Sequence, residues 1–439
     1  MFSNSKISKW LFYLFILLLP WQTRLILLPH QIEYLSFSIY LSEIVLWLAI
    51  GFWLADDYKK IKLPGVFLFF LIFAGLSILW AEDRVAGYRL WLYIFEGILV
   101  FLYLTPSSSP FSRGRLGLRL GFNKITLAIK NISPKWHKHQ FISGSESGGF
   151  IKVFLFSLIF VSGFAIFQFF NLGSEAFKWL GLAERGAWNL GDIVVLGEGG
   201  TSASLSAGRW LRAYGPMSHP NILGGYLAVG VLLIFNNVNN GGLCALGRKD
   251  PHCYFSLALF LFTLILTFSR SAWLALAIAS AYFLFKNLGS REVRKFAMFS
   301  LILIAVLGYI FAPFITTRVK SEGYLENKSN IERVASWKEG LVVWKNNPVL
   351  GTGLGNYTIG YQVSNSQPAH NIFLLVLAEL GIAGFLLYLF IWRKFWKMPS
   401  ARTILLLFLV IGLFDHYLWT LYSGQMLFWL GLGLIFQEN

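Results

Sequence analysis

Charged side chains are scarce in this sequence of 439 residues: Asp, Glu, Lys and Arg make up 13% of it, about half the share of an ordinary soluble domain. Cysteine is nearly absent, and two residues cannot form a disulfide framework. Hydrophobic residues reach 56%, and 42 Phe and 17 Trp would all need burial in a soluble fold. Acidic residues are outnumbered, with 21 Asp and Glu against 37 Lys and Arg. The composition excludes an ordinary soluble domain and indicates an integral membrane protein.

Apolar runs recur along the whole chain, and a bilayer core needs about 20 such residues for each helix. The runs are residues 10–28, 39–55, 64–80, 90–104, 151–170, 221–236, 254–268, 271–285, 296–313, 371–391, 403–418 and 424–437. Only Ser269 and Arg270 separate the seventh run from the eighth, and we interpret them as two helices because an Arg in the middle of one crossing would be costly. The sequence therefore predicts an all-α polytopic membrane protein with about twelve transmembrane helices, forming a single domain over residues 1–439.

The positions of Lys and Arg predict which side of the membrane each loop faces. With the N-terminus in the cytoplasm, 23 of the 37 basic residues fall in cytoplasmic segments, although the outer loops are as long in total. The net charge of +16 is thus a topology signal, and a nucleic-acid partner is not needed to explain it. We expect a protein of the cytoplasmic (inner) membrane, in contact with membrane lipids, with both termini in the cytoplasm.

Three long segments interrupt the apolar runs. Residues 105–150, expected inside, are rich in Ser, Gly, Lys and Arg, and we predict a flexible basic loop that contacts anionic headgroups. Residues 171–220 and 314–369 are expected on the periplasmic or extracellular side. The second outer loop places apolar residues at steps of three and four, namely Ile331, Val334, Trp337, Leu341 and Trp344. This pattern predicts an amphipathic helix.

Polar clusters at the outer face are the candidates for chemistry. They are Arg212–Asn221 before a helix, Ser269–Trp273 between two helices, and Pro368–Asn371 at the start of another helix. Each has a structural alternative, since an Arg at a helix end can extend to the interface and a His at a helix start can hold a turn. The seven His residues show no paired spacing with carboxylates, and no Cys lies on the outer face, so we expect neither a metal site nor a cofactor.

Four motifs, in this order, resemble those of the O-antigen ligase and O-antigen polymerase superfamily. They are Arg-x-x-Gly-x-x-x-His-Pro-Asn at 212–221, Ser-Arg-Ser-Ala-Trp at 269–273, Arg-x-x-x-Trp at 333–337 with Asn-Pro-x-x-Gly-x-Gly at 347–353, and His-Asn with a later Glu-x-Gly at 370–381. The resemblance covers residues 205–437, whereas the first half matches only as a run of membrane helices. It implies a fold like that of the glycosyltransferase C enzymes.

The resemblance also implies a donor, a glycan linked through diphosphate to a polyprenol such as undecaprenol. Arg212 and Arg270 would bind the diphosphate, because a guanidinium offers two parallel donors and stays charged. His370 would be the catalytic base or would orient the acceptor hydroxyl. Metal would not be required. Second-rank contacts to the acceptor or the sugar are Tyr214, His219, Arg333, Trp337 and Asn371.

The acceptor is left open by these residues. A lipid A core would make the protein a ligase of lipopolysaccharide biosynthesis, a second glycan would make it a polysaccharide polymerase, and a protein Ser or Thr would make it a protein O-oligosaccharyltransferase. A polysaccharide or lipid transporter is the alternative from a different class, and it predicts repeated hydropathy and charges at the membrane midplane. The polar clusters lie instead at one surface, which favours a glycan transferase whose site faces outward.

Overall fold

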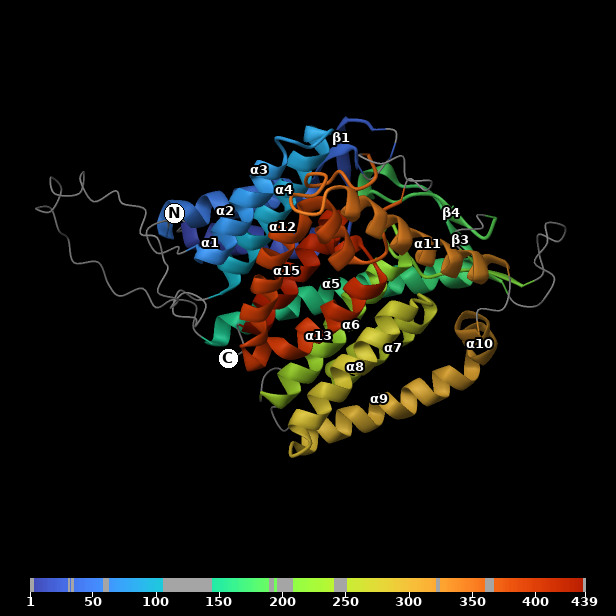
Figure 1. Ribbon diagram of the computed structural model, residues 1–439. Coiled ribbons are helices and arrows are strands. Elements are labelled where there is room, and N and C mark those ends of the chain that lie inside the picture. The colour runs from blue at the N-terminus through green and yellow to red at the C-terminus, as the bar shows by residue number, and fades with distance from the viewer. Residues whose placement is uncertain are drawn as a thin grey trace, which may run out of the picture.

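Helices form most of the chain that the structure describes, which is residues 4–30, 32, 35–57, 63–105, 144–188, 193–195, 208–240, 251–320, 324–359 and 367–436. Figure 1 shows this computed structural model, in which short strands lie at the margin of the packed helices. The helices are α1 (Asn4–Leu18), α2 (Leu41–Asp57), α3 (Gly65–Ser77), α4 (Arg84–Leu104), α5 (Gly144–Asn171), α6 (Pro220–Asn239), α7 (Pro251–Leu266), α8 (Arg270–Asn287), α9 (Arg291–Ile310), α10 (Ala312–Lys320), α11 (Tyr324–Asn346), α12 (Ile372–Trp396), α13 (Arg402–Phe414), α14 (Tyr417–Thr420) and α15 (Tyr422–Phe436). Three antiparallel pairs are formed by β1 (Arg24–Leu28) with β2 (Phe37–Tyr40), β3 (Gly173–Ser174) with β4 (Arg185–Gly186), and β5 (Ile193–Val195) with β6 (Arg209–Leu211).

Several described helices have the length and composition of a membrane crossing. Five of them reach that length: Arg84–Leu104, Gly148–Asn171, Pro220–Asn239, Arg291–Ile310 and Ile372–Trp396. Shorter apolar helices are Gly65–Ser77, His252–Leu266, Pro399–Phe414 and Tyr422–Phe436. The prediction of a mostly helical, polytopic membrane protein is therefore confirmed, as is the division of residues 254–285 into two helices, α7 and α8. The count of about twelve crossings stays a prediction.

Helix α6 lies at the centre of the bundle and contacts α5, α7, α8, α13 and α15. Nearly all of its residues are buried, as expected for a helix that is apolar on every side. Two glycines in its second turn permit the close packing: a Cβ at Gly224 would lie 2.9 Å from the Cβ of Ala272, and one at Gly225 would overlap the Tyr417 hydroxyl. The start of α6 is thereby held against α8 and α14.

The prediction of a helix over residues 10–28 is wrong beyond Leu18. Helix α1 ends there, and Arg24–Leu28 form strand β1, which pairs with β2. Pro20 disfavours helical backbone at the residue before it, which accounts for the end of the helix. The following Leu and Ile residues fit a strand as well as a helix, because a short apolar run does not distinguish the two.

The prediction of one helix over residues 403–418 is also wrong. Helix α13 ends at Phe414, Asp415 is extended (φ −150°, ψ 162°), and the four-residue α14 follows. The run contains no Pro, and its one Gly, Gly412, lies within helix α13. The break turns Asp415 toward the start of α6, where its carboxylate accepts a hydrogen bond from Asn221.

Helix α12 is interrupted at Gly381 (φ 61°, ψ −171°). The loop that follows α11 supplies partners for the interrupted backbone: Ile382 N–H donates to the Pro348 carbonyl (2.9 Å), and Gly353 N–H donates to the Glu379 carbonyl (2.9 Å). A broken helix in apolar surroundings needs such partners, because no water can replace them. The Asn-Pro-x-x-Gly-x-Gly motif thus fixes α11 to the middle of α12.

The predicted amphipathic helix is part of α11; three of the five apolar residues that predict it are exposed, whereas Trp337 and Trp344 are half-buried. Ile331, Val334 and Leu341 are exposed, whereas Ser336 and Val343 are buried on the opposite face. The predicted basic loop 105–150 lies largely outside the described residues, but its last part, from Gly144, begins helix α5.

Candidate functional site

Four polar side chains from different parts of the fold lie in a row beside the start of α6, and we call this row the polar chain. Arg212 Nη2 donates to Asn221 Oδ1 (3.0 Å), Asn221 Nδ2 donates to Asp415 Oδ2 (2.6 Å), and Asp415 Oδ1 lies 3.9 Å from His370 Nδ1. Arg212 follows β6, Asn221 belongs to the first turn of α6, Asp415 follows α13, and His370 precedes α12. The structure thus brings together the predicted residues Arg212 and His370, with Asn221 and Asp415 between them.

The local sequence at the start of α6 explains how Asn221 reaches this position. His219 is the N-cap of the helix, and its Nδ1 accepts a hydrogen bond from the Asn221 N–H (3.1 Å). Pro220 takes the first helical position, where its missing N–H and fixed φ cause no loss. In the His-Pro-Asn motif, His219 and Pro220 therefore build the turn and Asn221 carries the functional amide.

Asp415 is a buried carboxylate that the sequence-based candidates did not include. Burial by itself raises the pKa of a carboxyl group, but the interaction with His370 outweighs it and the pKa of Asp415 falls below its usual range. The backbone N–H of His416 also donates to Asp415 Oδ1 (3.1 Å). The available signal in the sequence is the Asp-His pair close to the end of the apolar run 403–418, a run that predicts a helix at this position.

His370 is the partly accessible end of the chain, with 22% of its side chain exposed. Its Nδ1 lies on the side of Asp415, 3.9 Å from Oδ1 and beyond hydrogen-bond distance. Trp337 Nε1 donates to the His370 backbone carbonyl (3.3 Å) and fixes the segment before α12. The predicted Trp337 therefore contacts the site through the backbone of His370.

A second imidazole, that of His416, lies next to His370, with ring centroids 5.1 Å apart. Burial, the imidazole of His370 and, more weakly, the guanidinium of Arg333 lower the pKa of His416 to about 3. His416 is therefore neutral at pH 7, and its Nδ1 lies 2.7 Å from Thr420 Oγ1. Arg333 was a predicted second-rank contact, and its charge acts at this imidazole.

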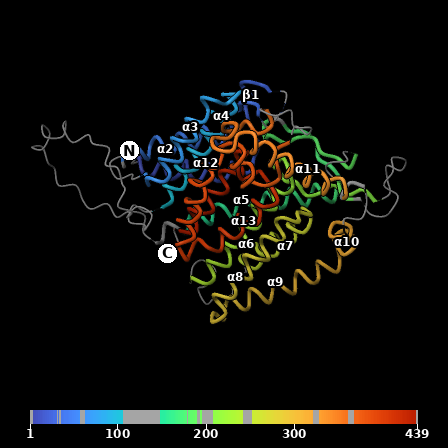
Figure 2. Tube along the Cα trace, in the orientation of Figure 1, coloured from blue at the N-terminus to red at the C-terminus, as the bar shows by residue number. Residues whose placement is uncertain are grey.

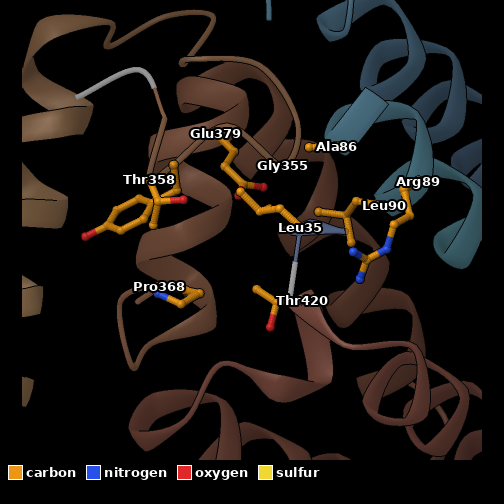
Figure 3. Close-up of a pocket in the computed structure, with 10 residues that line it drawn as sticks. Leu35, Ala86, Arg89, Leu90, Gly355, Thr358, Pro368, Glu379 and Thr420 are labelled. Atoms are coloured by element: carbon orange, nitrogen blue, oxygen red, sulfur yellow. The ribbon is translucent and has the colours of Figure 1, made fainter. Parts of the chain in front are cut away.

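Thr420 also lines a small cavity, together with Arg89, Thr358 and Glu379 (Figure 3). The cavity has a volume of about 20 Å³, which is room for about one water molecule. Trp419 Nε1 donates to Glu379 Oε2 (3.0 Å) beside it.

Arg270 lies in a cluster of three arginines around the turn between α7 and α8. Arg212 Nε donates to the Thr267 carbonyl (2.9 Å) and Arg318 Nη2 donates to the Phe268 carbonyl (3.1 Å). Arg270, at the start of α8, donates to the Arg318 carbonyl (3.2 Å) and to Asn330 Oδ1 (2.8 Å).

This turn has two properties of an anion site beyond its guanidinium groups. The N-terminus of the 18-residue helix α8 opens there, and backbone N–H groups at a helix start favour anions. Phe268 has a positive φ of 50°, a conformation that is rare for a side chain of this size and that occurs often at functional sites. Arg318 was not among the sequence-based candidates, because nothing around it in the sequence forms a motif.

Two other predicted contacts have structural partners here. Tyr214 is 1% exposed, and the guanidinium of Arg185 lies 4.4 Å from the centre of its ring. Asn371 is the N-cap of α12, where its Oδ1 accepts a hydrogen bond from the Leu374 N–H (3.0 Å). Contact between either residue and a substrate stays a prediction.

His370, Asp415 and His416 are also metal-ligating groups, and their ligand atoms lie within 4.8 Å of one another. Within the described part of the chain, this is the one such group of three. Spacing along the chain does not reveal this group, because His370 is remote in sequence from the other two residues. Two of its members have other polar partners, since Asp415 accepts from Asn221 and His416 Nδ1 contacts Thr420.

No curated protein matches the chain. The family model described as O-antigen ligase matches residues 255–389, a region that contains the Ser269–Trp273 turn, helix α11 and His370. The match indicates a membrane glycan transferase of the O-antigen ligase or polymerase type. The resemblance of this chain to the O-antigen ligase superfamily is therefore confirmed, and it is over residues 255–389 that the family is recognised.

Proposed function

We propose that this protein transfers a glycan from a polyprenyl diphosphate to an acceptor hydroxyl at the outer face of the cytoplasmic membrane, without a metal ion. The observation that supports this most strongly is the polar chain from Arg212 to His370. One end of this chain is a guanidinium, which suits an anionic leaving group, and the other is an imidazole, which suits an acceptor hydroxyl. The O-antigen ligase match over residues 255–389 supports the same class of reaction.

The donor side of the reaction requires positive charge. When the bond between the anomeric carbon and the diphosphate oxygen breaks, negative charge develops on the diphosphate. Arg212 and Arg270, held at the two ends of the α7–α8 turn, would bind this group through charge-assisted hydrogen bonds. Both guanidinium groups stay charged throughout, so no proton is needed to stabilise the leaving group.

The acceptor side requires a base. The acceptor oxygen attacks the anomeric carbon from the face opposite the diphosphate and forms the new glycosidic bond with inversion. The hydroxyl proton goes to Nε2 of His370, and the resulting imidazolium is stabilised by Asp415 at Nδ1. The products are the glycosylated acceptor and free polyprenyl diphosphate.

The charge distribution and the fold support the proposed orientation in the membrane. The start of α1 and the end of α15 lie on one side of the molecule, whereas α10 and α11 lie on the other (Figure 2). Arg270 belongs to the second side, because it contacts Arg318 of α10. With both termini in the cytoplasm, the site therefore lies on the outer side of the membrane. The lipid-linked donor is found on that side after it has been flipped.

The acceptor is a lipid A core, a second glycan or a protein hydroxyl, and each gives a different product with the same donor. One observation favours a transporter, since discontinuous helices such as α12 are common in transporters. The loop after α11 fills that break with hydrogen bonds, however. Arg212, Arg270 and Asp415 also lie at the ends of helices and strands rather than within a helix.

Turnover by purified protein in nanodiscs tests the proposal. Undecaprenyl-diphosphate glycan is supplied with each acceptor class, and Arg212→Ala, Arg270→Ala and His370→Ala are compared with the wild type. Arg294→Ala, at an exposed residue near the start of α9, is the matched control. We expect loss of product in the three site variants only. Wild-type turnover in all three would refute the assignment, and movement of labelled lipid without a new glycosidic bond would indicate a transporter.

A further inference from the structure

Asn221 separates a buried cation from a buried anion. Arg212, Asn221 and Asp415 are 5%, 4% and 4% exposed. The amide oxygen of Asn221 accepts from the Arg212 guanidinium at 3.0 Å, and its amide nitrogen donates to the Asp415 carboxylate at 2.6 Å. We infer that Asn221 is a positioning residue whose neutral amide keeps Arg212 and Asp415 from forming a direct ion pair. The inference rests on the function proposed above for Arg212 and His370.

The chemistry of the amide explains why Asn can do this. It presents an acceptor and a donor in one planar group, so it satisfies a guanidinium on one side and a carboxylate on the other. A hydroxyl is too short to span both partners, and a carboxylate would repel Asp415. The amide is also held in place, because the backbone N–H of Asn221 is bound by His219 Nδ1 at the start of α6.

A direct ion pair would disable both ends of the site. In surroundings of low dielectric constant, a guanidinium and a carboxylate attract each other strongly and form paired hydrogen bonds. Arg212 would then direct to Asp415 the donors that a diphosphate needs. Asp415 would turn from His370 and leave the imidazole without an orienting partner. With Asn221 between them, the cation serves the donor substrate and the anion serves the base.

The alternative is that Asn221 only packs the turn at the start of α6. A double substitution distinguishes this alternative from the inference. Asn221→Ala opens the space and lets Arg212 reach Asp415, so the Kd for undecaprenyl diphosphate should rise at least about tenfold. Asp415→Asn added to this variant removes the competing anion, so donor binding should return to within about threefold of the wild type. If Asn221 only packs the turn, the second substitution repairs nothing.

The experiment measures binding of undecaprenyl diphosphate to the full chain in nanodiscs, without turnover. The variants are Asn221→Ala, Asn221→Ala with Asp415→Asn, Asp415→Asn alone, and Arg212→Ala, each with a thermal melt. If Asn221→Ala does not fold, Asn221→Ser takes its place in both backgrounds. Weak binding that Asp415→Asn restores supports the inference. Wild-type binding by the Asn221 variants, or weak binding that Asp415→Asn leaves unchanged, overturns it.

The same set separates this inference from the proposed function. Arg212→Ala should bind the donor weakly in any case, because the guanidinium itself is absent. If Arg212→Ala binds undecaprenyl diphosphate like the wild type, the proposed function of Arg212 fails. If Arg212→Ala binds weakly and the Asn221 variants bind normally, only the role of Asn221 fails.

Discussion

Asp415→Asn tests the base half of the site with the smallest change of shape. The side chain keeps its size, and its oxygen can still accept from Asn221, but the negative charge next to His370 is gone. The wild-type carboxylate lies 3.9 Å from His370 Nδ1. Two unit charges at this distance attract by about 4 kcal/mol when the effective dielectric constant is about 20. This attraction is felt only once His370 takes up the acceptor proton, so it lowers the barrier rather than strengthening substrate binding.

The expected effect on turnover follows from that figure. An attraction of about 4 kcal/mol corresponds to a rate factor of about a thousand. His370 is 22% exposed, and solvent screening reduces the factor, so we expect kcat to fall by about 100-fold to 1,000-fold. The KM for the donor should change by less than about threefold, because Asn221 still holds Arg212. The assay is steady-state turnover with undecaprenyl-diphosphate glycan, and a kcat within about threefold of the wild type would refute a role of Asp415 in catalysis.

The pH dependence of Asp415 gives a second readout of the same variant. Because the pKa of Asp415 is lowered in the folded protein, its charge stabilises the fold above the pKa of the unfolded chain, about 3.9, and this stability is lost as the pH falls toward the folded value. The difference in thermal stability between wild type and Asp415→Asn should therefore shrink as the pH falls below about 5. A difference that stays unchanged as the pH falls from about 5 to about 3 would contradict a lowered pKa of Asp415.

Three further predictions concern the rest of the site. Arg318→Ala should weaken donor binding about tenfold relative to the Arg294→Ala control, and equal binding by the two variants would place Arg318 outside the donor site. Gly381→Ala should lower the stability of the protein by about 1–3 kcal/mol in a detergent melt, whereas Gly308→Ala, with no atom within 4 Å of the added Cβ, should not. A chelator should leave turnover unchanged; if activity is lost and Zn²⁺ restores it, the group of His370, Asp415 and His416 is a metal site.

The long helices could be predicted because length and apolar composition determine them together. Helices α5 and α12 lie in the two longest apolar runs, and an apolar run of this length has few other ways to satisfy its backbone. The errors fall where a run ends. Residues 24–28 form a strand that depends on its partner β2, and the break after Phe414 depends on the contact between Asp415 and Asn221. Neither partner belongs to the same apolar run, so local pattern could not reveal them.

The residues of the candidate site also fall into those that could be predicted from the sequence and those that could not. Arg212, Arg270 and His370 could be found because each lies in a motif at a helix end. Asp415 and Arg318 could not, since their contacts join residues 194 and 50 positions apart, to Asn221 and Phe268 respectively. Charge alone did not mark them either, because a carboxylate at the end of an apolar run most often has a purely structural partner.

The His-Pro-Asn motif shows why this part of the site could be predicted from the sequence. His219 caps α6 and Pro220 starts it, so the side chain of Asn221 must emerge in the first turn. Gly224 and Gly225 let α6 approach α8 and α14. The Asn221 amide then lies between Arg212, which is bound to the α7–α8 turn, and Asp415. A cap, a helix start and two glycines thus position an amide between opposite charges, and each of these steps is local in sequence. What is not local is the identity of the charges, and that is where the structure adds Asp415.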